Sequence, residues 1–290
     1  PGHIAQSTPD KLAVVMAQSG FTYTYKELDD AANRFSQALA NHGLKPGDHV
    51  ALCLENHDRY FEVVWGCHYA GLVYTACSSR LTSDELAYIL NDCGAKAFIT
   101  SKYKADQAQE ISNQIQHVDL RLMLDGVIDG YDSYEHLVAQ HPSEPLPNRK
   151  EGADMLYSSG TTGLPKPLVH DHGGTMLNGM AHKTVMYDVG CSYEPNSWGE
   201  RFMWYSSTGW VMWNAQMSGL LNGTTCVIYD GNPSGPKDAP DWGTLWRFAA
   251  RNRVTFFGAG AAFYANCQKA GLDLASLGDL SHIRALGTTG

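Results

Sequence analysis

The sequence predicts an α/β fold in which strands alternate with helices in layered, mostly parallel sheets. Three observations support this prediction. Short apolar runs such as residues 50–54 lack the alternation of a half-exposed strand, as expected of strands buried on both faces. Amphipathic helical patterns separate the runs, and helices that join successive strands give crossover connections and a parallel sheet. The 290 residues, 43% of them hydrophobic, suffice to cover such sheets on both sides.

The first half of the chain contains two helix starts that can be read directly. Residues 21–24 are typical of a strand end, and Thr24 with Glu27 has the spacing of a capping box, in which each side chain bonds the other residue's backbone N–H. Thr82 with Glu85 repeats the pattern and opens a second helix. Further strands are expected at residues 97–99, 120–124, 155–157, 224–229, 254–257 and 282–286.

A polar seam divides the chain near its middle. Residues 141–152 contain three prolines and no apolar periodicity, which is typical of a connection between compact parts. We therefore predict a first α/β subdomain over residues 1–150 and a second subdomain over residues 151–290.

Composition and charge exclude several classes of protein. Lys and Arg number 21 against 30 Asp and Glu, so the net charge is −9 and no basic surface for nucleic acid is expected. Seven cysteines, an odd number without C-x-x-C spacing, predict neither a disulfide framework nor a zinc ribbon, and favour a reducing, cytoplasmic compartment. No stretch has the length and apolarity of a membrane span.

Three consecutive residues are of types that bind metal ions. His170, Asp171 and His172 are all ligand types, and His182 follows ten residues after His172. A third ligand of suitable spacing is not evident nearby. We therefore expect a solvated strand end here and no metal site.

The most informative stretch is the string YSSGTTGLPK at residues 157–166. Its two glycines let the backbone curl, so that successive N–H groups can point at one anion, and its hydroxyl side chains add donors. Lys166 offers a point charge for the same anion. A Walker A loop is excluded because it needs G-x-x-x-x-G-K-[ST]. Judged as glycine, serine and threonine alone, the segment is equally compatible with a polar surface loop.

The complete string resembles the phosphate-binding signature of the AMP-forming acyl-CoA synthetase superfamily, which includes luciferases and peptide-synthetase adenylation domains. The resemblance extends over nearly the whole chain. The N-terminal half, with RLTSDEL at residues 80–86, is similar to medium- and long-chain acyl-CoA synthetases. The segments WYSSTGWVMWN at 204–214 and VTFFG at 254–258 are similar to acetoacetyl-CoA and acetyl-CoA synthetases. Pro167 stands where the family usually has glycine, and its missing N–H predicts altered strand geometry behind the loop.

The resemblance implies a fold and a set of site residues. The fold is the large N-terminal domain of the acyl-adenylate-forming enzymes, with residues 151–290 as an incomplete phosphate-loop and acyl-pocket subdomain and the small C-terminal lysine domain absent. The β- and γ-phosphates of ATP would be held by Ser158, Ser159, Gly160, Thr161, Thr162, Gly163 and Lys166. Within that set, the catalytic candidates are Thr161, Thr162 and Lys166. The acyl pocket would be lined by Trp210, Val211, Met212 and Thr289, and Gly290 would contact adenine. On composition alone, the four tryptophans between residues 198 and 213 are more typical of a core.

The implied activity is an AMP-forming carboxylate–CoA ligase that uses ATP, Mg²⁺ and coenzyme A. Its partners would be small molecules, and an oligomer is compatible with the sequence. Bulky pocket walls favour a short acid such as acetoacetate or acetate, while a medium- or long-chain fatty acid is the alternative that the N-terminal half supports. A peptide-synthetase domain is disfavoured because residues 211–214 contain no acid, and a P-loop kinase is disfavoured by the loop spacing. A non-catalytic nucleotide-binding fragment is the alternative of another class. We expect these 290 residues alone to have negligible ligase activity.

Overall fold

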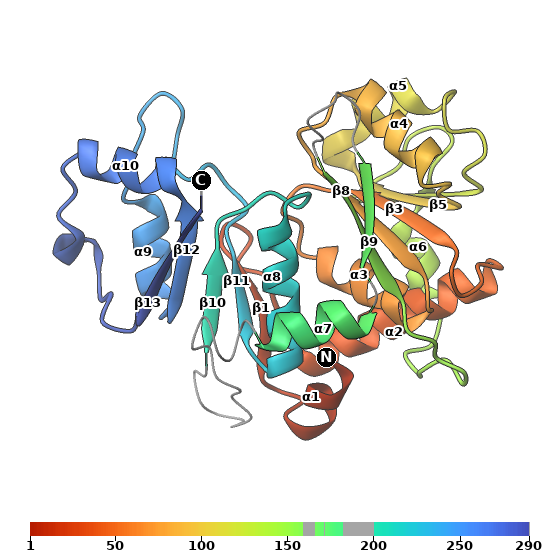
Figure 1. Ribbon diagram of the computed structural model, residues 1–290, viewed down its shortest axis with the longest axis horizontal. Helices are drawn as coiled ribbons and strands as arrows, with labels where there is room; N and C mark the ends of the chain where they lie inside the picture. Colours follow the sequence, from red (N-terminus) through yellow and green to blue (C-terminus); the bar gives the residue numbers. More distant parts are fainter. Residues whose placement is uncertain (159–165, 171, 182–199, 290) are drawn as a thin grey trace. The chain divides into compact units, whose positions relative to one another are not determined.

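The protein is described here by a computed structural model that covers residues 1–158, 166–170, 172–181 and 200–289. The chain forms two compact units, each with its own sheet (Figure 1). The six-stranded unit contains the described parts of Pro1–Leu28, Met176–Ser206 and Trp210–Gly290, and the seven-stranded unit contains those of Asp29–Thr175 and Ser207–Gly209.

The sheet of the seven-stranded unit has the order β7-β6-β5-β3-β4-β8-β9, and its neighbours are parallel except for the antiparallel pair β8–β9. Its strands are β3 (His49–Cys53), β4 (Val73–Cys77), β5 (Ala97–Ser101), β6 (Leu120–Leu124), β7 (Asp132–Ser133), β8 (Ala153–Ser158) and β9 (Lys166–His170). Its helices are α3 (Tyr60–Tyr69), α4 (Ser83–Asp92), α5 (Ala105–Ile111), α6 (Tyr134–Ala139) and the 3₁₀ helix η1 (Lys102–Lys104). Helix α4 and helix α5 pack Leu90 and Ile111 against Phe98 in one buried cluster.

The sheet of the six-stranded unit has the order β13-β12-β10-β11-β1-β2, and only the pair β1–β2 is antiparallel. Its strands are β1 (Leu12–Met16), β2 (Thr22–Thr24), β10 (Arg201–Trp204), β11 (Thr225–Ile228), β12 (Phe256–Gly260) and β13 (Ala285–Thr289). Its helices are α1 (Gly2–Ser7), α8 (Val211–Gly219), α9 (Thr244–Arg251), α10 (Ala261–Lys269), η3 (Leu220–Asn222) and η4 (Leu274–Leu277). Two further helices contain residues of both units: α2 (Tyr25–Asn41) and α7 (His172–Ala181).

Both predicted capping boxes are present. Thr24 donates its N–H to Glu27 Oε2 at 2.8 Å, and the Glu27 N–H returns a bond to Thr24 Oγ1 at 3.2 Å. Thr82 and Glu85 make the same pair of bonds at 2.8 and 3.3 Å. Each box satisfies two backbone donors that a helix start leaves without an intrahelical partner.

Two strand predictions were misplaced along the chain. The strand expected at residues 254–257 runs over Phe256–Gly260, because the Val254 N–H bonds the Ala249 carbonyl and closes helix α9. The strand expected at 282–286 runs over Ala285–Thr289, because the Ile283 N–H closes a turn on Leu280. In both cases an apolar residue that packs on the core belongs to the turn before the strand.

The residues that make up the two compact units differ from the ranges predicted by a division at residue 150. Strand β8 pairs in parallel with β4, so the hairpin after the seam belongs to the sheet of the preceding residues. Strand β1 pairs in parallel with β11, as Val14 opposite Cys226, so the first 28 residues belong with the end of the chain. Pairing over such separations leaves no trace in local composition.

Two further features concern the described residues as a whole. Six cysteines are buried and free, namely Cys53, Cys67, Cys77, Cys93, Cys226 and Cys267. The helices were also compared with the length and apolarity that a membrane span needs. None of the helices in the described ranges is long and apolar enough to cross a bilayer.

Candidate functional site

The predicted phosphate loop connects two strands that pair with each other. Strand β8 ends at Ser158 and strand β9 begins at Lys166, and these two residues are direct partners in the antiparallel register. Lys166 is exposed to solvent. Ser159, Gly160, Thr161, Thr162 and Gly163 lie outside the described residues. The structure thus brings the two ends of the predicted loop side by side.

The proline at the start of β9 does not disturb the pairing, contrary to the expectation of altered strand geometry. Pro167 lies opposite Tyr157, and the register continues from Ser158–Lys166 to Asp154–His170 without a shift. Strand β9 is the last of the described strands in its sheet, and an edge strand tolerates proline because one side of its backbone needs no partner. Strand β9 ends at His170, while Asp171 and His182 of the candidate metal-ligand group lie outside the described residues, so the expectation of a solvated strand end without a metal site stays a prediction.

Strand β8 is held to the neighbouring elements close to the loop. The Tyr157 hydroxyl donates to Asp92 Oδ2 at 2.7 Å and ties β8 to the end of helix α4. Burial, the hydrogen bond to the Asp92 carboxylate and neighbouring negative charge raise the pKa of Tyr157, so the phenol stays protonated. At the start of the strand, a Cβ on Gly152 would lie 2.5 Å from the Leu72 carbonyl oxygen, so only glycine allows β8 to approach β4 this closely.

A buried acid–base pair lies behind the same strand. Asp154 Oδ1 is 3.2 Å from His68 Nε2, and both side chains are less than a tenth exposed. Tyr74 hydrogen-bonds the same carboxylate, and its ring meets the His68 imidazole edge-on with centroids 5.3 Å apart. Charged groups in such surroundings are stable only when they are paired, so this cluster makes the position of β8 depend on a polar contact.

Another polar cluster gathers at the carboxyl ends of β3, β5 and β6. The His57 ring nitrogens lie 2.9 Å from Asp58 Oδ1 and 2.9 Å from Asp125 Oδ2, and Ser101 donates to Glu55 at 2.6 Å. Burial by itself lowers the pKa of His57, but the two neighbouring aspartates and the charge of Glu55 outweigh it and raise the pKa to about 9. Sequence reasoning missed this cluster, whose members are spread over 71 residues (55–125).

The predicted acyl-pocket residues lie in the six-stranded unit, on helix α8 and on strand β13. Trp210 is the residue before helix α8 and is 38% exposed, and Val211 is 56% exposed. Met212 is buried and packs with Phe202, Trp204 and Phe256. In Figure 1, α8 runs alongside β10 and β11, which places Met212 over one face of the sheet.

Strand register shows which residues share that face. Trp204 on β10 pairs with Gly258 on β12, and Gly258 pairs with Gly287 on β13. Because side chains alternate along a strand, Thr289 points to the same face as the position of Gly287. Met212, Trp204 and Thr289 therefore belong to one side of one sheet.

Gly258 and Gly287 are glycines because the Trp204 ring leaves no space for a Cβ, and not because their backbone conformation requires glycine. A Cβ on Gly258 would lie 2.2 Å from Trp204 Cε3, and one on Gly287 would lie 2.4 Å from Trp204 Cζ3. Neither glycine has a positive φ. The indole is 4% exposed, in keeping with the composition-based expectation of a tryptophan core. The signal that sequence reasoning missed is a large aromatic residue placed opposite glycine on the neighbouring strands.

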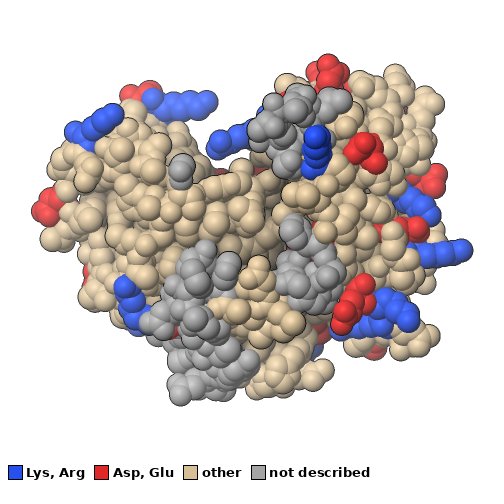
Figure 2. Space-filling view, viewed as in Figure 1, with Lys and Arg blue, Asp and Glu red and all other residues tan. Residues whose placement is uncertain are grey.

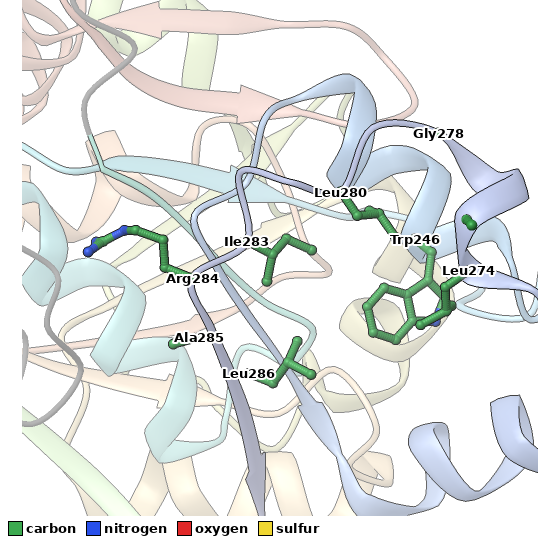
Figure 3. Close-up of a pocket in the computed structure, with 9 residues that line it drawn as sticks. Trp246, Leu274, Gly278, Leu280, Ile283, Arg284, Ala285 and Leu286 are labelled. Carbon is green, nitrogen blue, oxygen red and sulfur yellow. The ribbon is translucent and has the colours of Figure 1, made fainter.

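The opposite face of the sheet carries the cavity drawn in Figure 3, of about 390 Å³. Its lining is mostly apolar, with Trp246 of helix α9 and Leu286 of strand β13 (Figure 3). Arg284 lies at its margin and makes an ion pair with Glu200. Among the described residues, none of the predicted site residues lines this cavity. On the surface that Figure 2 shows, acidic and basic side chains are interspersed.

A family comparison decides where this architecture belongs. The family described as "AMP-binding enzyme" matches residues 3–290. The chain belongs to the AMP-binding enzyme family. The expected fold, the large N-terminal domain of the acyl-adenylate-forming enzymes, is thereby confirmed, as is the resemblance on which it rested.

Relatives within the family are acyl-CoA synthetases. The chain is 27% identical to the acetoacetyl-coenzyme A synthetase of Rhizobium meliloti, over 93% of this chain and 43% of that protein. It is 29% identical to the acetyl-coenzyme A synthetase of Gemmatimonas aurantiaca, over 93% of this chain and 44% of that protein. The chain thus spans less than half the length of the curated relatives it matches.

Solved structures agree with this placement. The acetoacetyl-CoA synthetase from Streptomyces lividans superposes with a TM-score of 0.88 at 30% identity, covering 99% of this chain and 45% of that one. The N-terminal domain of FACL13 from Mycobacterium tuberculosis gives 0.82 at 22% identity, covering all of this chain and 68% of that one, and shows the fold alone.

The roles of individual residues stay predictions within this AMP-binding fold. Of the predicted phosphate residues, Ser158 and Lys166 are described and belong to the seven-stranded unit, and the predicted acyl residues Trp210, Val211, Met212 and Thr289 belong to the six-stranded unit. Gly290, the predicted adenine contact, lies outside the described residues.

Proposed function

We propose that the complete gene product containing this chain is an AMP-forming carboxylate–CoA ligase acting on a short acid such as acetoacetate or acetate. The observation that supports it best is the phosphate-loop string of an AMP-binding enzyme mounted between paired strand ends at Ser158 and Lys166. The relatives named acetoacetyl- and acetyl-coenzyme A synthetase support the short acid. The six free cysteines support a reducing compartment, and we propose a cytoplasmic one.

The proposed chemistry has two steps. A carboxylate oxygen of the acid attacks the α-phosphorus of ATP, the bond to the β-phosphate breaks, and pyrophosphate leaves. The thiolate sulfur of coenzyme A then attacks the acyl carbon, and AMP leaves with the electron pair of the broken C–O bond. In the first step negative charge develops on the departing phosphates, and prearranged N–H groups and cations stabilise such charge most effectively.

Lys166 is the described residue best placed for that task. It is exposed, it begins β9, and it lies opposite Ser158, where the predicted loop starts. Thr161, Thr162 and the loop N–H groups would complete the phosphate site. Mg²⁺ would neutralise phosphate charge when it arrives with ATP, but the described residues offer no group of three ligands for it, so we assign no protein site.

The test is carboxylate-dependent exchange of pyrophosphate into ATP by the complete gene product, with acids from acetate and acetoacetate to palmitate. We expect exchange to peak at two to four carbons. Lys166→Ala should lower the exchange rate by about 100-fold, the effect of removing one charge-stabilising group. Lys237→Ala removes a lysine that is also exposed, from a turn of the six-stranded unit, and should change little.

The other outcomes separate the alternatives. A peak at long chains would favour the fatty acid–CoA ligase. ATP binding without exchange for any acid would favour a non-catalytic nucleotide-binding protein.

A further inference from the structure

Trp204 sits at the junction of the elements that carry the predicted acyl-pocket residues. It belongs to one buried cluster with Met212 of helix α8. Its ring also lies across Gly258 and Gly287, so it reaches over strand β12 to strand β13, two residues before Thr289. All of these residues belong to the six-stranded unit. A molecule held between α8 and β13 on this face would therefore rest on the indole.

The two glycines indicate that the space below the ring is fully used. With Cβ positions 2.2 and 2.4 Å from indole carbons, even a methyl group has no room on either strand. Two positions further along β12, by contrast, a Cβ at Gly260 would have its nearest neighbour at 3.8 Å. The indole therefore cannot sink further into the sheet to admit a longer chain above it.

The ring also presents an unsatisfied donor. Cε3 and Cζ3 lie on the glycines, so Nε1 lies on the opposite edge of the indole, where it is buried and has no hydrogen-bond partner. Gln216, one turn after Met212, is in the same state: its Oε1 accepts the Trp204 backbone N–H at 3.2 Å, while Nε2 is buried and unpaired. An unpaired buried donor is costly, and a ligand oxygen would satisfy it.

We propose that Trp204 is the floor of the acyl site, where its bulk limits chain length and its ring N–H, with the amide of Gln216, favours an acid that carries an oxygen on its chain. This inference rests on the proposed function. It predicts that a 3-oxo acid such as acetoacetate is used better than butyrate, which has a methylene in place of the carbonyl. A site that hydrogen-bonds a substrate oxygen penalises the analogue without it, because its own polar groups then stay unpaired.

The experiment measures pyrophosphate exchange by the complete gene product with acetoacetate, butyrate and hexanoate. Trp204→Phe keeps a flat ring but loses the N–H, and should lower the ratio of acetoacetate to butyrate rates by about 5- to 10-fold. Gln216→Met keeps the side-chain length and should act in the same direction. Trp204→Leu opens the floor and should raise hexanoate use relative to acetoacetate by about tenfold or more, since one methylene of pocket space is worth at least that.

The matched control is a tryptophan on the other face of the same sheet. Trp246 stacks on Phe257 with ring centroids 4.5 Å apart, and its N–H contacts the Cys267 sulfur at 3.4 Å. Trp246→Phe and Trp246→Leu should cost stability comparable to that of the Trp204 variants, which thermal unfolding measures, and leave the acid preferences unchanged.

The outcomes for the inference and for the proposed function are distinct. If the unmodified protein exchanges with no acid, the proposed function fails. If it exchanges with short acids but Trp204→Phe and Gln216→Met keep the same acetoacetate-to-butyrate ratio, the donor role is overturned. If Trp204→Leu folds but still excludes hexanoate, the floor role is overturned. If Trp204→Leu does not fold, Trp204→Phe decides. Unchanged hexanoate use by Trp204→Phe, together with an unchanged acetoacetate-to-butyrate ratio, rejects the assignment as a whole.

Discussion

The two sheets support their predicted sites in different ways. In the seven-stranded unit, the predicted phosphate residues lie within nine positions of one another, between two strands whose ends are partners at Ser158 and Lys166. In the six-stranded unit, the face with Met212 and Thr289 is assembled from segments that begin at residues 201, 211, 256 and 285. One site depends on a local string of residues, and the other depends on tertiary packing.

This difference determines which substitutions matter in each unit. A phosphate is bound by backbone N–H groups, short hydroxyls and a lysine, so the remaining scaffold must mainly keep β8 and β9 in place. An acyl chain is recognised by shape, so one methyl group below Trp204 can change the site. We therefore expect the seven-stranded unit to be most sensitive to its buried polar contacts and the six-stranded unit to be most sensitive to side-chain volume.

The largest effect is expected from breaking the buried pair behind β8. His68→Leu removes the imidazole that lies 3.2 Å from the Asp154 carboxylate and leaves this buried group without its basic neighbour, although the Tyr74 hydrogen bond is kept. An uncompensated buried charge destabilises a protein strongly, so we expect a loss of about 3 kcal/mol in the free energy of unfolding at pH 7. Urea unfolding of the variant measures this loss.

The double variant His68→Leu/Asp154→Leu is the control for this prediction. It removes the buried charge as well as its partner, so it should recover much of the lost stability. A double variant no more stable than His68→Leu would show that lost packing, rather than the buried carboxylate without its imidazole neighbour, causes the loss.

A smaller loss of stability, caused by added side-chain volume, is expected in the six-stranded unit. Gly258→Ala places a methyl group against Trp204, whose ring cannot move away because Gly287 and Phe256 confine it. Overpacking of this kind costs about 1–3 kcal/mol. Gly260→Ala adds the same methyl group on the same strand, where the nearest atom is 3.8 Å away, and should change stability by less than about 0.5 kcal/mol. Equal losses of stability in the two variants would show that the close contact of Gly258 with the Trp204 ring has no special role.

Local signals in the sequence predicted local structure well. The capping boxes at Thr24 and Thr82 mark the starts of α2 and α4, because both partners of each box are only three residues apart. The strand predicted at residues 120–124 is β6 with the same bounds. These features need no information about the rest of the chain.

Long-range features could not be predicted in the same way. The pairing of β1 with β11 joins residues 212 positions apart, and the contact of Trp204 with Gly258 and Gly287 requires the order of three strands. The sequence string containing Trp204 suggested the class of enzyme but could not show that the indole lies flat on two neighbouring strands. The phosphate loop, by contrast, could be proposed from the sequence because the residue types that bind phosphate follow one another in the chain.

The smallest predicted effect concerns pH and again distinguishes the two units. His57 of the seven-stranded unit has its pKa raised to about 9 by its aspartate neighbours, against an ordinary value of about 6.5. A raised pKa means that the folded state holds the proton more tightly than the unfolded state. The resulting stabilisation is fully present below about pH 6.5 and is lost as the pH rises through about 9. We expect it to amount to about 1–2 kcal/mol, because Asp125 is largely exposed and its charge is screened.

Urea unfolding from pH 6 to pH 10 tests this expectation with one histidine from each unit. His57→Gln should be less stable than the unmodified protein at pH 6, and the difference should shrink to near zero by about pH 10 as the native imidazole loses its proton. His282 of the six-stranded unit is 42% exposed and 3.8 Å from Asp279, so His282→Gln removes only a weak surface contact and should change the free energy of unfolding by less than about 0.5 kcal/mol. A His57→Gln difference that stays constant over this range would mean that the ring contributes through packing and neutral hydrogen bonds, and the two units would then not differ in how they use buried charge at this position.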